Sequence, residues 1–239
     1  MGVEQFIAHR GWSGIAPENT LSAIKLALEE PRIAGIEIDV HLTKDGVPVV
    51  IHDSLVDRTT DGSGEVRGIT AEELGKLDAG SWFDPAFAGE KVPTLEEVLA
   101  LVASKKPLLI ELKQAAGMYS ALEERVIQLI HKFDAVKDCQ LISFDHHSLL
   151  ACKELAPEIA RIAVFAGAPL CIIEGVNRIE AKAVSLSHQY IQEEIVESLR
   201  QNGTGLIAWT VDDQKSAERV WKIEEKIAIT TNHPEHLWK

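Results

Sequence analysis

The 239-residue chain has few cysteines, no long apolar run and no concentration of positive charge. Cys139, Cys152 and Cys171 are an odd number and include no Cys-x-x-Cys pair. This pattern argues against a disulfide framework and against a zinc site built from thiolates. We therefore expect all three cysteines to be buried free thiols.

The absence of long apolar and basic segments limits the partners of the chain. No run approaches the ~18 apolar residues of a membrane span, and the N-terminus lacks the layout of a signal peptide. The formal net charge of −13 disfavours extended binding to nucleic acid or to anionic lipid headgroups. We expect a cytoplasmic protein with no stable membrane anchor and no nucleic-acid partner. An anionic small molecule remains compatible with this charge if a bound cation supplies positive potential.

Short apolar runs alternate with amphipathic segments along most of the chain. With 46% hydrophobic and 26% charged residues, the chain can bury a sizeable core, and an α/β barrel of this length is commonly one domain. Repeated strand and helix in this order predicts a mostly parallel sheet covered by helices. The predicted strands are 6–9, 35–40, 47–52, 108–113, 140–144, 159–165, 181–186, 205–211 and 227–231.

Helices are predicted between most of these strands. Residues 17–20 begin one helix, and Thr94 with Glu97 forms the capping box of another. The remaining helical patterns are 71–77, 119–132, 147–155, 195–201 and 216–223.

Nine predicted strands are one more than a (β/α)8 barrel needs. The connection 41–46 is too short for a helix and contains the turn signal Asp45-Gly46. Either one strand is irregular, or the second and third strands belong to one distorted unit. Residues 53–93 interrupt the alternation and are too long for an ordinary loop, so they predict a small insertion over the barrel mouth. We expect residues 1–239 to form a single catalytic barrel domain that contains this insertion.

Two histidines bracket two carboxylates in the first quarter of the chain. His9 ends the first strand and His52 ends the third, whereas Glu37 and Asp39 share one face of the second, because residues i and i+2 of a strand point to the same side. Burying such groups is costly unless they are paired or bind a metal. Barrel enzymes place catalytic groups at these carboxyl ends of their strands.

Glu111 and Lys113 repeat the i, i+2 arrangement on the fourth predicted strand. Glu37, Asp39 and Glu111 would form an all-oxygen site, which suits Mg²⁺, Ca²⁺ or Mn²⁺ rather than zinc. The structural alternative is a polar interior held by ion pairs, for instance Glu37 with Arg10 and Glu111 with Lys113.

The remaining polar groups complete a chemical pattern. His9 and His52 have the ordinary pKa that suits proton transfer near neutrality. Arg10 offers a planar fork of donors to phosphate oxygens, and Lys113 offers a point charge. A cation, two histidines and two positive side chains match the needs of phosphodiester cleavage.

Nine short motifs follow one another across nearly half of the chain: His9-Arg10-Gly11, Glu18-Asn19-Thr20, Glu37-Ile38-Asp39-Val40, Lys44-Asp45-Gly46, His52-Asp53, Asp57-Arg58-Thr59-Thr60, Gly80-Ser81-Trp82-Phe83, Pro93-Thr94-Leu95-Glu96-Glu97 and Glu111-Leu112-Lys113. In this order and at these spacings they resemble the glycerophosphodiester phosphodiesterase family, and Trp209-Thr210-Val211 extends the match.

The resemblance implies a TIM-type (β/α)8 barrel with a small insertion after the third strand. It implies metal-dependent hydrolysis of glycerophosphodiesters to sn-glycerol 3-phosphate and an alcohol, by a route commonly drawn through a cyclic phosphate. The residues alone leave open whether the glycerol hydroxyl or water attacks. The resemblance gives these roles: Glu37, Asp39 and Glu111 hold one divalent cation, Mg²⁺ or Ca²⁺ with Mn²⁺ as a third choice; His9 and His52 exchange protons; Arg10 and Lys113 bind phosphate.

Aromatic residues and one departure complete the sequence-based expectations. Trp209 is expected to bind substrate, and Trp82, Phe83 and Phe165 either line the mouth with it or belong to the core. Asn232 stands where the family usually has Asp, and the sequence leaves its role open.

Two other functions remain as alternatives, a lysophospholipase D-type phosphodiesterase and a non-catalytic phosphate-binding barrel. The preferred alcohol, the metal, the oligomeric state and the division of roles between the histidines are not determined by the sequence.

Overall fold

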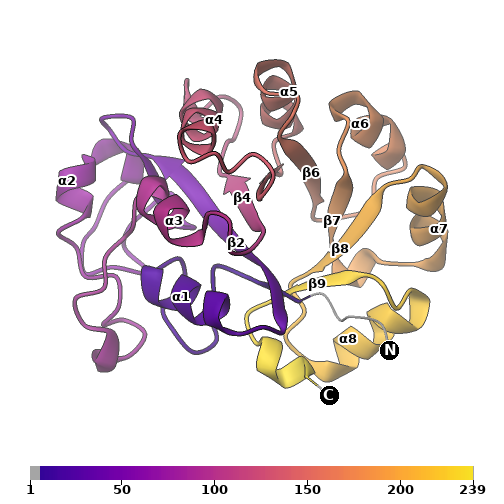
Figure 1. The fold of residues 1–239 in the computed structure, drawn as a ribbon, viewed down its shortest axis with the longest axis horizontal. Coiled ribbons are helices and arrows are strands. Elements are labelled where there is room, and N and C mark those ends of the chain that lie inside the picture. Colours follow the sequence, from indigo (N-terminus) through magenta and orange to yellow (C-terminus); the bar gives the residue numbers. More distant parts are fainter. Residues whose placement is uncertain (1–5, 239) are drawn as a thin grey trace.

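A closed barrel of parallel strands forms the centre of the computed structural model, which describes residues 6–238 (Figure 1). The first strand pairs with both the second and the last, which closes the sheet. The eight barrel strands are β1 (Phe6–Ala8), β2 (Ile33–Leu42), β4 (Leu108–Leu112), β5 (Cys139–Ser143), β6 (Ala160–Phe165), β7 (Ala183–Ser187), β8 (Gly205–Trp209) and β9 (Ala228–Thr231).

A ninth strand, β3 (Pro48–Val50), explains the surplus in the sequence-based count. It runs antiparallel to β2, with Val40 opposite Val50. The second and third predicted strands therefore form one hairpin, and β3 lies outside the barrel closure. The predicted TIM-type fold with a small insertion after the third strand is confirmed.

Helices follow the strands and cover the barrel (Figure 1). Thr20 caps the first by accepting from the Ala23 amide, and Thr94 and Glu97 form the predicted capping box. One helix, over residues 172–179, was not predicted, because Gly175 and four β-branched residues weaken its helical signal. The helices are α1 (Leu21–Glu29), α2 (Ala71–Leu74), α3 (Leu95–Val102), α4 (Leu122–Lys132), α5 (His146–Leu155), α6 (Ile172–Ile179), α7 (Glu193–Gln201) and α8 (Gln214–Ile223).

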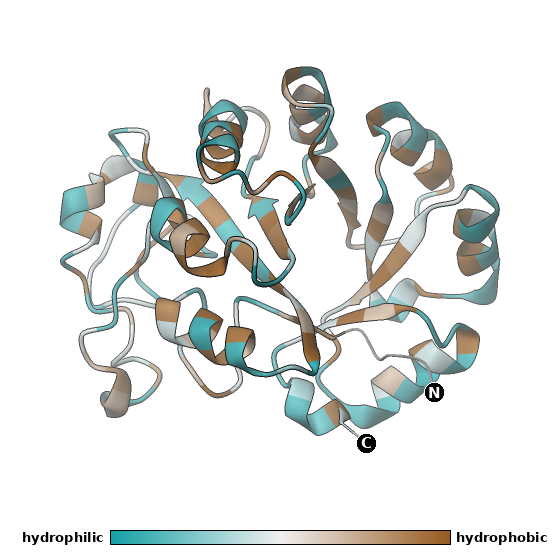
Figure 2. Ribbon diagram, in the orientation of Figure 1, coloured by the Kyte–Doolittle hydropathy of each residue, from teal (hydrophilic) through white to brown (hydrophobic). Residues whose placement is uncertain are grey.

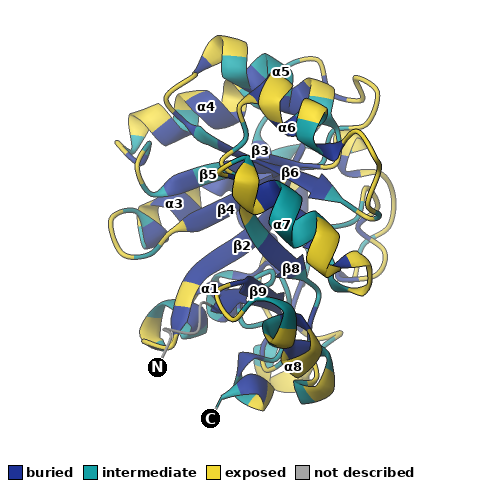
Figure 3. Ribbon diagram, turned by 90° about the vertical axis from the view of Figure 1, so that its right-hand side faces the viewer, coloured by how far each residue is buried: buried dark blue, intermediate teal, exposed yellow. Residues whose placement is uncertain are grey.

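Successive side chains of each barrel strand point alternately towards the helices and into the barrel. Ile36, Ile38 and Val40 of β2 belong to the apolar layer between barrel and helices, which Figure 2 shows as brown strands and brown inner helix faces. The strands are almost wholly buried (Figure 3). Inside the barrel, an apolar cluster that includes Leu109 forms a layer, and a hollow lined by Ile7, Leu109 and Ile207 lies on its side towards the amino ends of the strands. Glu111, two residues further along β4, stands on the same face above it.

The segment between β3 and α3 has an apolar cluster of its own. Val56, Val66 and Leu74 pack there with residues of β3. The aromatic side chains of the segment stay within it: Trp82 Nε1 donates to the Ala79 carbonyl, and Trp82 packs edge-on against Phe83. Two short 3₁₀ turns, Val66–Gly68 and Pro85–Phe87, and helix α2 are its regular elements.

The cysteine prediction is correct for two residues and wrong for the third. Cys139 and Cys152 are buried, and burial raises the pKa of each thiol to about 12. Cys171 is exposed, because it lies in the loop immediately before α6 rather than on a packed element. None of the helices within residues 6–238 is long and apolar enough to cross a bilayer.

A tight turn connects β1 to the loop that precedes α1. Arg10 (φ 57°) and Gly11 (φ 77°) both adopt the left-handed region, and the Gly11 amide donates to the Glu37 carbonyl. A Cβ at Gly11 would lie 2.7 Å from the carbonyl carbon of Ala23. Only glycine therefore lets β1 and α1 approach closely enough to hold Arg10 at the barrel mouth.

We predict that Gly11→Ala lowers the free energy of unfolding by about 3 kcal/mol, the sum of left-handed strain and overpacking against the α1 backbone. Gly46→Ala is the matched control, since Gly46 has φ 76° but no atom within 4 Å of its added Cβ. It should cost about 1–2 kcal/mol. Urea unfolding measures both, and equal losses would show that the close approach contributes nothing.

Candidate active site

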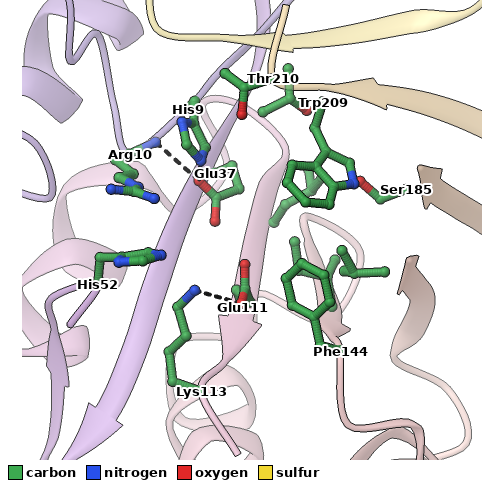
Figure 4. Close-up of a pocket in the computed structure, with 14 residues that line it drawn as sticks. His9, Arg10, Glu37, His52, Glu111, Lys113, Phe144, Ser185, Trp209 and Thr210 are labelled. Atoms are coloured by element: carbon green, nitrogen blue, oxygen red, sulfur yellow. Dashed lines mark hydrogen bonds and ion pairs between the residues drawn. The ribbon is translucent and has the colours of Figure 1, made fainter. Parts of the chain in front are cut away.

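A pocket opens at the carboxyl ends of the barrel strands and has two chemically different sides. Figure 4 shows the charged groups of β1, β2, β4 and the β3 end on one side, and Phe144 and Trp209 on the other. Seven of the eight residues predicted for the site line it: His9, Arg10, Glu37, His52, Glu111, Lys113 and Trp209. The eighth, Asp39, is buried next to it and contacts two of them.

Three carboxylates meet beside this pocket. Asp39 pairs in register with Glu111 across β2 and β4, and Glu37 lies on the same face of β2. One oxygen of each of the three lies within 4.8 Å of the others, and all three side chains are buried. Glu37 Oε1 has no hydrogen-bond partner among the described residues. An oxygen-only cluster with an unpartnered buried oxygen fits a hard divalent cation.

The positive side chains balance these carboxylates only in part. Lys113 Nζ lies 2.8 Å from Asp39 Oδ1 and 2.6 Å from Glu111 Oε1, and Arg10 Nε lies 3.3 Å from Asp39 Oδ2. Burial raises the pKa of Asp39, but Lys113 and Arg10 outweigh it and hold that pKa below its usual value. Burial and the charge of Asp39 raise the pKa of Glu37 well above normal and that of Glu111 to about 7. Negative charge therefore remains in excess.

The ion pairs differ in part from the structural alternative derived from the sequence. Lys113 does pair with Glu111. Arg10 contacts Glu37 through its backbone amide, at 3.0 Å, and directs its guanidinium to Asp39 and to Glu18. The Arg10 side chain therefore forms its ion pairs with Asp39 and Glu18 and none with Glu37.

His9 is held through an amide. Its Nδ1 lies 2.7 Å from Asn232 Oδ1, while Asn232 Nδ2 donates to Asp212 Oδ2 at 2.7 Å. Because Asp212 fixes the amide orientation, His9 Nδ1 carries the proton and Nε2 is left with a free lone pair. That Nε2 lies 3.8 Å from Glu37 Oε2. Burial lowers the pKa of His9 to about 4, so the ring is neutral at pH 7. The structure thus gives Asn232 a positioning contact.

His52 is held through a carboxylate. Its Nδ1 lies 2.6 Å from Asp53 Oδ1, and the hydrogen bonds of Arg58 lower the pKa of Asp53 to about 2. Burial lowers the pKa of His52, although Asp39 and Asp53 both favour its protonated form.

Ion pairs link Arg10 to His52 on the charged side of the mouth. Arg10 donates to Glu18 at 2.8 Å, and Arg58 donates to both oxygens of Glu18 and to both oxygens of Asp53. The series runs from Arg10 to His52 without a break. Sequence reasoning assigned no role to Glu18, Asp53 or Arg58. Their only signal was membership of the ordered motifs.

The apolar side of the pocket was only partly predicted. Trp209 lines it as expected, and Phe144 meets Trp209 edge-on with ring centroids 5.4 Å apart. The indole Nε1 of Trp209 has no hydrogen-bond partner among the described residues. Phe165 is not part of the lining and packs against His146 instead. Phe144 and Ser185 were missed, because strand periodicity does not show which residues near a strand end face the mouth.

The class of protein follows from the two sides of this pocket. Imidazoles and fixed cations around a carboxylate cluster supply proton transfer and charge stabilisation for cleavage of a phosphate ester, and the apolar side has room for its organic part. On a TIM barrel this combination defines a phosphodiester hydrolase.

Comparison with known proteins identifies the family. The model of the "Glycerophosphoryl diester phosphodiesterase family" matches residues 9–236. A glycerophosphodiester phosphodiesterase from Caldanaerobacter subterraneus is 41% identical over 232 residues, which cover 97% of this chain and 95% of the relative. The chain therefore belongs to the glycerophosphoryl diester phosphodiesterase family and is a phosphoric diester hydrolase.

Solved structures agree with this assignment. A phosphodiesterase from Oleispira antarctica, in complex with the product sn-glycerol-3-phosphate, superposes with a TM-score of 0.91 at 31% identity and covers 98% of this chain and 94% of its own. A glycerophosphodiester phosphodiesterase from Agrobacterium tumefaciens has a TM-score of 0.83 at 29% identity, with 98% of both chains covered.

We predict that Arg58→Ala lowers kcat/KM for glycerophosphocholine by about 10–100-fold, the usual effect of removing a group that orients an active-site residue. Its guanidinium holds Asp53 against His52, so the pH profile should change as well. Arg67→Ala is the matched control, because Arg67 lies on the same insertion and pairs with exposed Glu65. Its kinetics should equal wild type. An unchanged rate and pH profile in Arg58→Ala would exclude a positioning role.

Proposed function

We propose that this enzyme hydrolyses glycerophosphodiesters to sn-glycerol 3-phosphate and an alcohol with the help of one divalent cation. The observation that carries the proposal is a single pocket that brings His9, His52, Arg10 and Lys113 around the buried carboxylate cluster. The product bound to the Oleispira antarctica phosphodiesterase supports the choice of substrate. We also propose that residues 1–239 act as one catalytic domain, with residues 53–93 as its insertion.

Glu37, Asp39 and Glu111 would hold the cation, Mg²⁺, Ca²⁺ or Mn²⁺. When bound, it supplies positive charge for the negative charge that grows on the nonbridging phosphate oxygens. The raised pKa values of Glu37 and Glu111 support this role, since they reflect carboxylates that lack sufficient counter-charge.

The cationic side chains and the aromatic side divide the substrate between them. The planar fork of Arg10 and the ammonium of Lys113 bind phosphate oxygens. Phe144 and Trp209 face the organic part.

The partners of the two histidines divide the proton transfers. Burial keeps His9 neutral, and the Asn232 amide orients the ring with Nε2 free, which suits a base that takes the proton of the attacking hydroxyl. A carboxylate holds His52, which stabilises an imidazolium and suits an acid that protonates the departing alcohol. This division applies whether the glycerol hydroxyl or water attacks.

Chelation should abolish the activity. We predict that EDTA-treated enzyme loses hydrolysis of glycerophosphocholine and that Mg²⁺, Ca²⁺ or Mn²⁺ restores it, because the carboxylate cluster needs a cation. Addition of the restoring cation should also raise the melting temperature of wild type but not of Glu37→Gln/Glu111→Gln. Full turnover by metal-stripped protein would refute the cation site.

The two histidines should respond differently to the leaving group. We predict that His9→Ala and His52→Ala each lower kcat on glycerophosphocholine by ~10²-fold or more. With a p-nitrophenyl ester of glycerol 3-phosphate, His52→Ala should regain most of its rate, because p-nitrophenolate leaves without a proton. His9→Ala should stay slow.

One control variant and one contrary outcome complete the histidine experiment. His131→Ala removes a surface histidine that pairs with exposed Glu158, and its rates should equal wild type. Rescue of His9→Ala instead of His52→Ala would reverse the assigned roles.

A further inference from the structure

Most of the exposed large hydrophobic side chains lie at one end of the barrel. Eight such side chains are exposed among residues 6–238. Two of them, Leu55 and Trp82, lie in the insertion, and Leu155 ends helix α5 at the opposite end of the barrel. The other five lie on loops that follow barrel strands, and we call them the apolar rim: Ile15, Met118, Phe144, Leu170 and Tyr190.

The topology of the fold places the apolar rim around the active-site pocket. The rim residues follow β1, β4, β5, β6 and β7, and the carboxyl ends of parallel barrel strands all face the same way. Phe144 belongs both to the rim and to the pocket lining. The rim and the opening of the pocket therefore share one face of the molecule.

Three of the rim loops lack charged side chains. Residues 114–121, 166–171 and 188–192 contain no Asp, Glu, Lys or Arg, although 26% of the chain is charged. Leu170 is fully exposed and lines a hollow between two of these loops, together with Ile172, Ile173, Tyr190 and Ile195; Glu194 is the one charged residue of this lining. Exposed apolar groups on uncharged loops can leave water without burying a charge.

We propose that the apolar rim docks onto a zwitterionic phospholipid surface. The choice of occupant rests on the proposed function, because a lipid surface is the partner that offers apolar chains to the rim and phosphodiester headgroups to the pocket inside it. Net charge of −13 and the absence of Lys and Arg from residues 114–121, 166–171 and 188–192 disfavour an anionic surface. Docking would bring lysophospholipids of that surface to the pocket, which soluble glycerophosphodiesters reach without docking.

The test measures binding separately from turnover. Protein in EDTA is sedimented with phosphatidylcholine vesicles, so that hydrolysis cannot alter the surface. Wild type should cosediment. Leu170→Asp should bind at least about tenfold more weakly, because it puts a charge in place of a leucine that docking would bury in the lipid surface. Leu155→Asp is the matched control, since it adds the same charge at an exposed leucine of the opposite end, and it should bind as wild type does.

A second measurement separates this proposal from the proposed function. The same variants, now supplied with the cation, are assayed for hydrolysis of soluble glycerophosphocholine. Leu170 does not line the pocket, so Leu170→Asp should keep the wild-type rate and lose hydrolysis of micellar lysophosphatidylcholine. Loss of glycerophosphocholine hydrolysis by wild type, with vesicle binding intact, would refute the function and leave the docking surface standing.

Three results would overturn the docking proposal. The first is that wild type does not bind phosphatidylcholine vesicles. The second is that Leu155→Asp weakens binding as much as Leu170→Asp does. The third is that Leu170→Asp changes the oligomeric state, measured by light scattering, while vesicle binding stays unchanged. The last result would assign the rim to contacts between copies of the chain.

Discussion

Repulsion among three buried carboxylates is the constraint on which this structure depends. Register between β2 and β4 places Asp39 beside Glu111, and strand alternation adds Glu37 to the same face. Lys113 and Arg10 hold Asp39 in its charged form, but they leave Glu37 and Glu111 with raised pKa values. Such a cluster is unfavourable in a closed barrel unless enough positive charge joins it, so the same energetic imbalance favours binding of a cation.

The barrel supports this cluster by dividing its interior into two levels. Leu109 belongs to the apolar filling, and Glu111, on the same face of the same strand, belongs to the site. Packing from below excludes water and strengthens each charge interaction above it. The insertion contributes from the side, since Arg58 links Glu18 of the barrel mouth to Asp53 and so to His52. The same segments therefore stabilise the fold and hold the residues of the site in place.

Local periodicity was enough to predict much of this arrangement from the sequence. The i, i+2 spacing placed Glu37 with Asp39, and polar groups at strand ends placed His9 and His52 at one mouth. Periodicity does not show strand direction, so the antiparallel β3 left the strand count open. It also cannot reveal pairs set by the tertiary fold, and His9 and Asn232 meet across 223 residues. The exposure of Cys171 was missed for the same reason, because it depends on where a loop lies.

The contact between His9 and Asn232 explains why an asparagine is compatible with the charges around position 232, where the family usually has Asp. An aspartate at position 232 would place its carboxylate against Asp212, which already accepts a hydrogen bond from the Asn232 amide. Two adjacent carboxylates would repel each other and raise the pKa of one of them. The amide instead bridges the two groups: it donates to Asp212 and accepts from His9 and from the Ser13 hydroxyl. The charge of Asp212 thus reaches His9 only through a neutral amide, and burial keeps this imidazole neutral, whereas the carboxylate of Asp53 contacts His52 directly and favours its charged form.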